Sequence, residues 1–316
     1  MLKMARAATA ASGKRTGLVL LIPAALLMSL ETPLRAQDLE PRAFSAAPVG
    51  VNFAMLGYGY STGDLLFDQA LNIDDARAQI NNLTGLYVRT IDFFGASSKL
   101  AILAPFVWGT WEGSLAGQDT STTRRGFADP RIQLAVSFLG APAQTPREFS
   151  GFREKTVAGA SLMVIVPLGR YDSSKLINLG TNRWAFRPRL GVSQASGKWI
   201  FELFGDVWLF TRNPDLRGAV IEQDPIWAIQ GDVIYTFRPG LWLGFNAGYG
   251  KGGQSIVNGV GKNNPQESTR LAGTLSVPVA RRHSFKFVYS TGVSARFGAD
   301  LDTFQVFYQY RWGGGL

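Results

Sequence analysis

The sequence predicts an all-β fold, a transmembrane antiparallel up-and-down β-barrel of about 12 strands that follows a cleaved N-terminal signal peptide. Three observations predict it: an export leader, a series of segments in which apolar and polar residues alternate, and links between them that alternate in length. Successive side chains of a strand point to opposite faces, so each alternating segment has one oily and one wet face. Such a series behind an export signal is typical of outer-membrane barrels.

The leader comes first. Four basic residues precede an apolar stretch at 18–30, and Ala36 offers a small residue for cleavage. The stretch falls short of the roughly 20 apolar residues that a membrane-spanning helix needs, so we expect a signal peptide that is removed. The expected organisation is a signal peptide at 1–36, a short periplasmic N-terminal segment at 37–48, the outer-membrane β-barrel at 49–312 and a Gly-rich tail at 313–316.

The composition fits a barrel wall. The chain has 36 Gly, 12% aromatic and only 17% charged residues, against about a quarter charged in an ordinary soluble domain. It has no Cys, so no disulfide supports the fold. The formal net charge of +9 includes basic residues of the leader and is too modest and scattered to favour nucleic acid as a partner. We expect no cofactor and no metal.

Twelve strands are expected, and several alternate clearly. In the last one, Phe304, Val306 and Tyr308 share an apolar face, and Gln305 and Gln309 share a polar one. The second, third and fifth strands do not show which face is wet. The expected ranges are 49–60, 82–94, 98–111, 126–139, 155–167, 182–194, 198–211, 225–238, 240–251, 267–279, 282–294 and 301–312.

The links support an outer-membrane arrangement. Tight turns are expected near 95–98, 194–197, 238–240 and 280–281. Longer polar links are expected between them, near 61–81, 112–125, 168–181, 212–224, 252–266 and 295–300. Outer-membrane barrels alternate short periplasmic turns with longer external loops, so both termini are predicted to be periplasmic. The link 140–154 is the exception, because it is long where a short turn is expected. Tryptophans near strand ends predict interfacial girdles, namely Trp108, Trp111, Trp184, Trp199, Trp242 and Trp312.

The candidate site is the inward face. Polar side chains that share a face within their own strands are predicted to line a lumen, and they carry charges of both signs. They either fill a narrow lumen as a structural network or line a water-filled path. Trp208 shares their face, and rings such as Phe204 and Phe210 would offer apolar contact. The candidates are Arg131, Arg187, Arg189, Glu202, Asp206, Gln230, Asp232, Arg238, Arg270, Lys286, Gln305, Gln309 and Arg311.

Catalysis has little support. The single His283 precedes Ser284, and adjacent residues of a strand point to opposite sides, so the two do not form a local hydrolytic pair. We therefore expect no enzyme. A lipid-modifying enzyme that uses His283 is kept as the less favoured alternative.

Three motifs resemble the outer-membrane transporter family associated with the meta-pathway of phenol degradation. They are Gly126-Phe-Ala-Asp-Pro130, Val166-Pro-Leu-Gly-Arg-Tyr-Asp172 and Trp184-x-Phe-x-Pro-x-Leu-Gly191, and the likeness extends over about 50–312. The resemblance implies an outer-membrane channel that takes up small organic compounds, aromatic or hydrophobic ones among them. It supplies no binding residues. Such barrels usually end on an aromatic residue, whereas four residues follow Trp312 here.

The expected location is the outer membrane of a Gram-negative cell. The expected partners are outer-membrane lipid, a small-molecule solute and the barrel-insertion machinery, and the protein is expected to be a monomer. The main alternative is a non-conducting structural or adhesive barrel.

Overall fold

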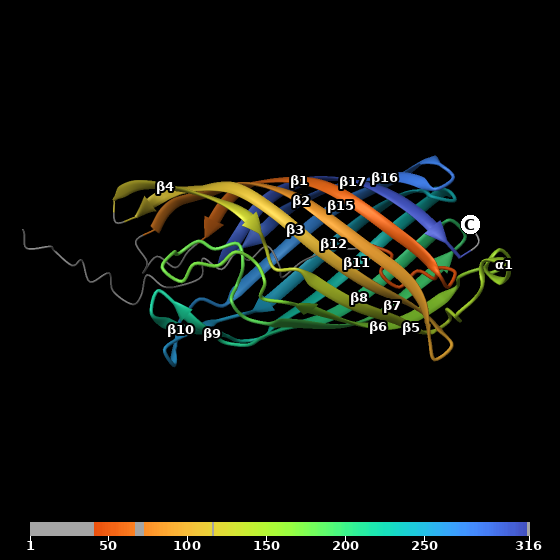
Figure 1. Ribbon diagram of the computed structural model, residues 1–316, viewed down its shortest axis with the longest axis horizontal. Coiled ribbons are helices and arrows are strands. Elements are labelled where there is room, and N and C mark those ends of the chain that lie inside the picture. The colour runs from red at the N-terminus through yellow and green to blue at the C-terminus, as the bar shows by residue number, and fades with distance from the viewer. Residues whose placement is uncertain (1–40, 67–72, 116, 315–316) are drawn as a thin grey trace, which may run out of the picture.

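A computed structural model describes residues 41–66, 73–115 and 117–314, and it is dominated by β-structure (Figure 1). Within these residues, no helix is long and apolar enough to cross a membrane. The predicted signal peptide lies outside the described residues. The strands are β1 (Val51–Leu66), β2 (Ile73–Phe93), β3 (Ala96–Leu115), β4 (Gln118–Phe127), β5 (Arg131–Leu139), β6 (Thr156–Ile165), β7 (Ala185–Ser196), β8 (Trp199–Phe210), β9 (Asn213–Leu216), β10 (Ala219–Gln223), β11 (Ile226–Arg238), β12 (Leu241–Gly252), β13 (Ser255–Val257), β14 (Val260–Gly261), β15 (Gln266–Ala280), β16 (His283–Ala295) and β17 (Gly298–Gly313), and the helix is α1 (Pro146–Phe149).

The barrel wall is one closed antiparallel sheet with twelve places around it, of which β4 and β5 share one. The predicted all-β barrel fold is thereby confirmed. The first and last strands close it: β1 pairs with β17 from Val51↔Gly313 to Leu66↔Gly298. The closure leaves no unpaired edge at β1 or β17, which a wall in hydrocarbon requires because unpaired backbone groups there cost several kcal/mol. A second, four-stranded sheet has the order β14-β13-β10-β9.

The fourth wall position contains two strands. The predicted strand 126–139 covers the end of β4 and all of β5, and these two strands pair with the C-terminal and the N-terminal part of β3, respectively. Pro130 lies at the break and has no N–H to donate to a ladder. The carboxylate of the buried Asp129 accepts hydrogen bonds from the backbone N–H of Gly169 and from the N–H and hydroxyl of Thr181, at 2.9, 2.9 and 2.6 Å. The break therefore fastens the long link 166–184 to the wall.

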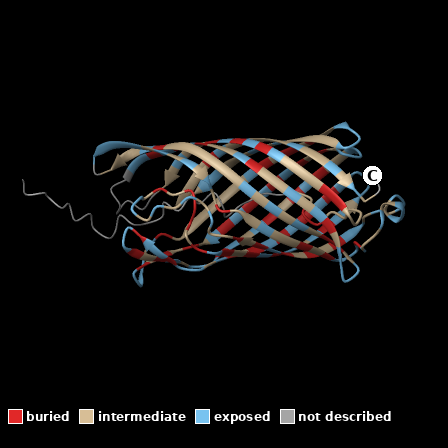
Figure 2. Ribbon diagram, viewed as in Figure 1, coloured by how far each residue is buried: buried red, intermediate tan, exposed pale blue. Residues whose placement is uncertain are grey.

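Buried and exposed residues alternate along the wall strands (Figure 2). In β8 every second residue from Ile200 to Trp208 is buried, whereas Phe201 and Leu203 are exposed. The same alternation identifies the inner faces that the sequence left open. Thr84 and Thr90 belong to the inner face of β2, and Arg89 is exposed on the other face. The inner face of β6 carries Val157, Gly159, Ser161, Met163 and Ile165, which are too weakly polar to mark it as wet.

The two ends of the barrel differ. The tight turns at 94–95, 197–198, 239–240 and 281–282 lie at one end with α1 and the C-terminus, called the turn end below (Figure 1). The opposite end, the loop end, carries β4, β9 and β10. The link 140–154 is long, as predicted, and contains α1, whose first turn is capped reciprocally by Thr145 and Glu148.

Several predicted loops are shorter than expected. The predicted link 112–125 is mostly strand, since β3 runs to Leu115 and β4 begins at Gln118, and the predicted link 295–300 reduces to residues 296–297. Within 61–81, only residues 67–72 lie outside the described strands. A strand whose two faces both contact water can consist of polar residues, as a loop does. The polarity of these stretches therefore did not distinguish a strand from a loop.

Candidate functional site

Five inward side chains from β7, β8 and β11 are linked inside the barrel. We call Arg187, Arg189, Asp206, Gln230 and Asp232 the central network; each is 2 to 6% exposed. Asp206 Oδ2 lies 2.9 Å from Arg189 Nη2, and Asp206 Oδ1 lies 3.8 Å from Arg187 Nε. The Gln230 amide accepts from Arg189 at 3.4 Å and donates to Asp232 at 2.9 Å. Buried charges are tolerated when they are paired and hydrogen-bonded in this way.

Aromatic rings support the two arginines of the central network. The guanidinium of Arg187 lies 4.9 Å from the ring centre of Trp208, and that of Arg189 lies 5.2 Å from the ring centre of Phe204. Both rings are almost fully buried, as predicted for Trp208. Cation–π contact strengthens when water is excluded, so the interior offers polar groups and ring faces side by side.

Residues 41–48, called the N-terminal segment below, contact the inner wall near the turn end. The backbone N–H of Arg42 donates to Glu202 Oε2 of β8 at 2.6 Å. Ser137 of β5 donates to the carbonyl of Phe44 at 3.0 Å, and Lys99 of β3 donates to the carbonyl of Ala43 at 3.1 Å. The segment therefore connects β8 to the neighbouring strands β5 and β3, from which β8 is separated in the wall by β6 and β7.

Phe44 anchors the N-terminal segment. Its side chain is 1% exposed, and its ring centre lies 5.7 Å from that of Phe204. Gly159 and Gly191 make this possible, because a Cβ at Gly159 would lie 2.5 Å from the Phe44 ring and one at Gly191 would lie 2.2 Å from the Phe204 ring. Gly191 ends one of the three motifs singled out in the sequence.

The link 140–154, which precedes β6, also holds the N-terminal segment. Glu154 Oε2 accepts from the backbone N–H of Ala46 at 3.2 Å. Burial raises the pKa of Glu154 above its ordinary value, although the charges of Arg42 and Lys99 oppose this. Ser97 completes the contact, since its hydroxyl lies 3.4 Å from the nitrogen and 3.1 Å from the oxygen of Ala47.

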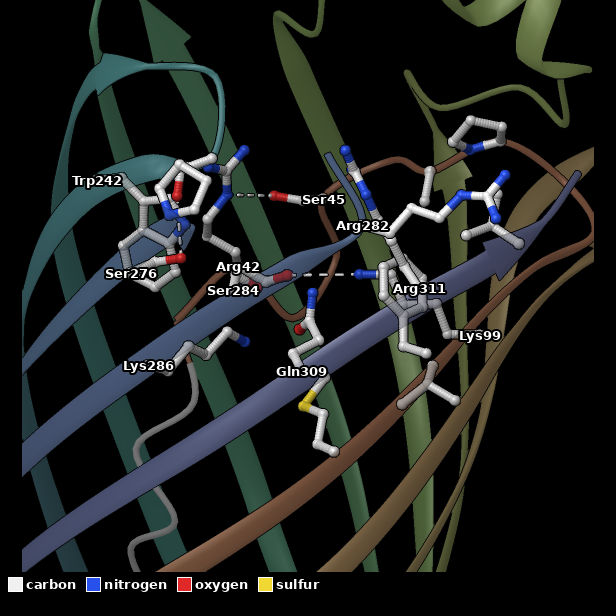
Figure 3. A pocket seen from close by; sticks show the side chains of 18 of the residues that line it. Arg42, Ser45, Lys99, Trp242, Ser276, Arg282, Ser284, Lys286, Gln309 and Arg311 are labelled. Carbon is white, nitrogen blue, oxygen red and sulfur yellow. Dashed lines mark hydrogen bonds between the residues drawn. The ribbon is translucent and has the colours of Figure 1, made fainter. Parts of the chain in front are cut away.

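A cavity of about 480 Å³ lies between the N-terminal segment and the turn-end wall (Figure 3). Lys286, Gln309 and Arg311 of the candidate list line it. Lys286 belongs to β16, and Gln309 and Arg311 belong to β17. The Arg311 guanidinium donates to the carbonyl of Arg281 at 2.8 Å, which fixes it at the rim.

The remaining candidates are spread over the barrel. Glu202 is buried opposite Asp232 in the pairing of β8 with β11 and binds the N-terminal segment. Arg270 donates to the carbonyl of Leu301 at 2.8 Å. Arg131 and Gln305 are half-buried, and Arg238 is exposed at the turn end. Five of the thirteen candidates thus belong to the central network, three line the turn-end cavity, and five lie outside both groups. Their role as lumen lining stays a prediction.

Sequence reasoning missed several residues of the turn-end cavity. Lys99 lies on a strand whose wet face was not assigned, and Arg42 lies in the segment expected to precede the barrel. Trp242 and Trp111 were expected in interfacial girdles but are 6% and 3% exposed and lie on inner faces. Position near a strand end does not fix the face, whereas the parity of Trp242 with Asn246, on the same face of β12, would have placed it inside.

The link 166–184 also enters the barrel, at the loop end. Its Ile177 and Leu179 pack in a buried cluster with Trp111, Ile80 and Leu301 of the wall. Arg124 fixes the link further by donating to the carbonyl of Ile177 at 2.7 Å. The interior is therefore narrowed near both ends.

His283 lies at the turn end beside aromatic rings. Its Nδ1 lies 2.6 Å from the hydroxyl of Tyr308, and its ring is 5.0 Å from that of Tyr310. The hydrogen-bond partner of the imidazole is thus a tyrosine hydroxyl. Among the described residues, no side chain of Ser, Asp or Glu is seen to hydrogen-bond to His283.

The sequence matches a family profile described as "Putative MetA-pathway of phenol degradation" over residues 67–306, about three quarters of the chain. The chain belongs to this family. The resemblance stated from the three motifs is thereby confirmed. No curated protein matches the chain.

Solved structures support the fold. An outer membrane channel from Pseudomonas putida F1 is similar, with a TM-score of 0.73, 20% identity, and coverage of 87% of this chain and all of that one. The translocator domain of the autotransporter NalP from Neisseria meningitidis has a TM-score of 0.51 and 9% identity, over 85% of this chain and 90% of that one. The transport unit of AIDA-I from Escherichia coli has a TM-score of 0.50 and 10% identity, over 90% and 96%. These likenesses concern the fold: the family member described here is a β-barrel whose fold is similar to that of an outer membrane channel.

Proposed function

We propose that this barrel is a channel for the passive uptake of small organic compounds, aromatic or hydrophobic ones among them. The carrying observation is that the turn end is narrowed by the N-terminal segment, a stretch of chain that is separate from the wall. A hydrogen bond that Glu202 accepts, hydrogen bonds that Ser137 and Lys99 donate, and the packing of the Phe44 ring hold it. Because each such hydrogen bond contributes about 0.5–3 kcal/mol and none of these bonds belongs to the strand ladder, the segment is displaceable without unfolding the barrel. The family and the polar inner face support the same proposal.

The expected setting belongs to this proposal. Exposed aromatic and aliphatic side chains on the outer face, such as Leu190, Trp227 and Phe245, suit contact with lipid. The protein is a monomer inserted by the barrel-insertion machinery after removal of its signal peptide, and the turn end faces the periplasm. No enzymatic activity is proposed.

A non-conducting barrel is the second candidate. The observation that favours it is the buried cluster of Ile177 and Leu179 with Trp111, which fills space at the loop end while the central network fills space further in. In that case the charges only stabilise the wall, and no ion passes.

Planar bilayers separate the two candidates. The channel proposal expects discrete conductance from the purified protein. Because the chain has no Cys, an Ala47→Cys and Ser97→Cys pair introduces the sole thiols, at positions whose atoms already contact. Oxidation should lock the N-terminal segment and lower the conductance, and a reductant should restore it. The Ser97→Cys single variant controls for the substitution.

Two results would count against the channel. Silent bilayers together with normal aromatic uptake in a deletion strain would leave the non-conducting barrel. Conductance that is identical in the oxidised and reduced pair would show that the N-terminal segment does not limit passage.

A further inference from the structure

The turn-end cavity carries charge of one sign. Six lysine or arginine residues line it: Arg42, Lys99, Arg281, Arg282, Lys286 and Arg311. Among the described residues that line it, none is Asp or Glu. This differs from the central network, in which Asp206 and Asp232 accompany two arginines. A concave site lined by one sign of charge concentrates ions of the opposite sign.

Two carboxylates are engaged with the N-terminal segment. Glu202 accepts from the backbone N–H of Arg42, and Glu154 accepts from that of Ala46. Glu154 acts on the charges of Arg42 and Lys99, which reduces the positive potential on that side. Lys286 and Arg311 stand on the paired strands β16 and β17, and no carboxylate of these two strands lines the cavity.

The lining is also apolar enough for an organic ligand. Phe53 and Met55 of β1 and Trp242 of β12 line the same cavity, and the guanidinium of Arg42 lies 5.8 Å from the ring centre of Trp242. In Figure 3 the side chains of Lys286 and Gln309 rise from two neighbouring strands toward Arg42 and Ser45. The volume of about 480 Å³ falls within the range of about 300–1,000 Å³ that is usual for small-molecule sites.

We propose that the turn-end cavity binds a small organic carboxylate. Its carboxylate group interacts with Lys286 and the surrounding basic groups, and its apolar part contacts Phe53, Met55 and Trp242. Gln309 provides an additional hydrogen-bond donor. The inference names a solute class for the proposed channel and depends on it for its biological use. Binding itself requires no conduction, so the two are tested separately.

The experiment compares three probes that differ in charge. 4-Fluorobenzoate, 4-fluorobenzyl alcohol and 4-fluorobenzylamine are titrated with the full chain in detergent, and fluorine NMR line broadening gives the affinity of each. Empty micelles correct for partition into detergent. We expect saturable binding of the benzoate alone.

The variants locate the binding. Lys286→Gln should weaken benzoate binding by about three- to tenfold, as expected for one partly solvated charge. Lys251→Gln is the matched control, because Lys251 is an exposed lysine of the loop end that pairs with Glu267 at 3.5 Å, and it should change nothing. Heat-dependent gel mobility confirms that each variant is a folded barrel.

Three results would overturn the inference. They are equal binding of the alcohol and the benzoate, an unchanged affinity in Lys286→Gln, or displacement of benzoate by an equal concentration of inorganic phosphate, which would indicate a general anion site. If the protein binds benzoate but gives no conductance in bilayers, the channel proposal is rejected and the carboxylate site is supported. Conductance without benzoate binding would do the reverse.

Discussion

Glu202 Oε2 accepts the backbone N–H of Arg42 at 2.6 Å, and this contact joins residues 160 positions apart in the sequence. Glu202 is 4% exposed and projects from β8 into the barrel. The burial of Glu202 makes the hydrogen bond costly to lose, because a buried hydrogen-bonding group that loses its partner has no water to replace it. Glu202 is thus a buried polar attachment of the N-terminal segment to the wall.

Replacing Glu202 should release the N-terminal segment. Glu202→Ala removes the acceptor and should weaken docking by about 1–3 kcal/mol. Trypsin cleavage after Arg42 reports release, because a docked backbone does not fit a protease cleft, and N-terminal sequencing identifies the product that begins at Ala43. Glu202→Gln keeps an acceptor and should cleave more slowly than Glu202→Ala. Equal cleavage of wild type and Glu202→Ala would contradict this role.

Gly159 and Phe44 should be energetically coupled. A Cβ at residue 159 would lie 2.5 Å from the Phe44 ring, so Gly159→Ala should cost about 1–3 kcal/mol by overpacking. In a Phe44→Ala background the same substitution meets no ring and should be nearly neutral. Thermal unfolding in detergent, followed by circular dichroism, measures the four variants of the cycle. An equal cost in both backgrounds would refute the packing of Phe44 on this strand.

Asp206 should be the most sensitive position of the central network. Asp206→Ala leaves Arg187 and Arg189 buried without their shared carboxylate, and breaking a buried ion pair in this way costs about 3–5 kcal/mol. Asp64→Ala is the control, since Asp64 pairs with Arg77 at 3.2 Å in the open and should lose about 0–1 kcal/mol. Urea unfolding in lipid vesicles gives both values. Comparable losses would mean that the interior charges are well hydrated.

Glu154 predicts a pH effect with a definite sign. Burial raises its pKa, so the folded protein keeps this proton to a higher pH than the unfolded chain does. The stability that protonation contributes is full below the ordinary value near 4.5 and is lost as the pH rises through the raised pKa. Wild type should therefore lose stability relative to Glu154→Gln over that rise.

The measurement is the difference in unfolding temperature between wild type and Glu154→Gln at several pH values. Glu154→Gln keeps an oxygen acceptor for the Ala46 N–H, so its docking contact remains. A difference that does not change with pH would show that Glu154 titrates as in the unfolded chain.

The sequence predicted the strands of the wall better than the contacts inside the barrel. The clear alternation of Glu202 and Asp206 with Phe201 and Leu203 identified both faces of β8, and the same reasoning placed Arg187 and Arg189 inside. In β6 the inner face carries no charged residue: it consists of Val157, Gly159, Ser161, Met163 and Ile165, and Phe44 packs at Gly159. Such a face has no polar pattern to detect.

The contents of the barrel depend on contacts between residues far apart in the sequence. Nothing local to residues 41–48 shows that Glu202, Ser137 and Lys99 hold them, and the turn-end cavity exists only because this segment forms one of its sides. Asp129 was noticed as part of a motif, but its partner Thr181 lies 52 positions away. Periodicity locates strands and faces, whereas these pairings follow from how the cylinder closes.

The seam between β1 and β17 has a consequence for assembly. Since the strands that complete the ring come from the two ends of the wall sequence, the ring cannot be finished until the ribosome has released the last strand. The N-terminal segment immediately precedes β1, so it either occupies the interior before the seam zips or threads through a mouth afterwards. If the segment docks before β1 pairs with β17, the barrel is narrowed as soon as it closes. If it docks afterwards, the barrel is first open and is narrowed later.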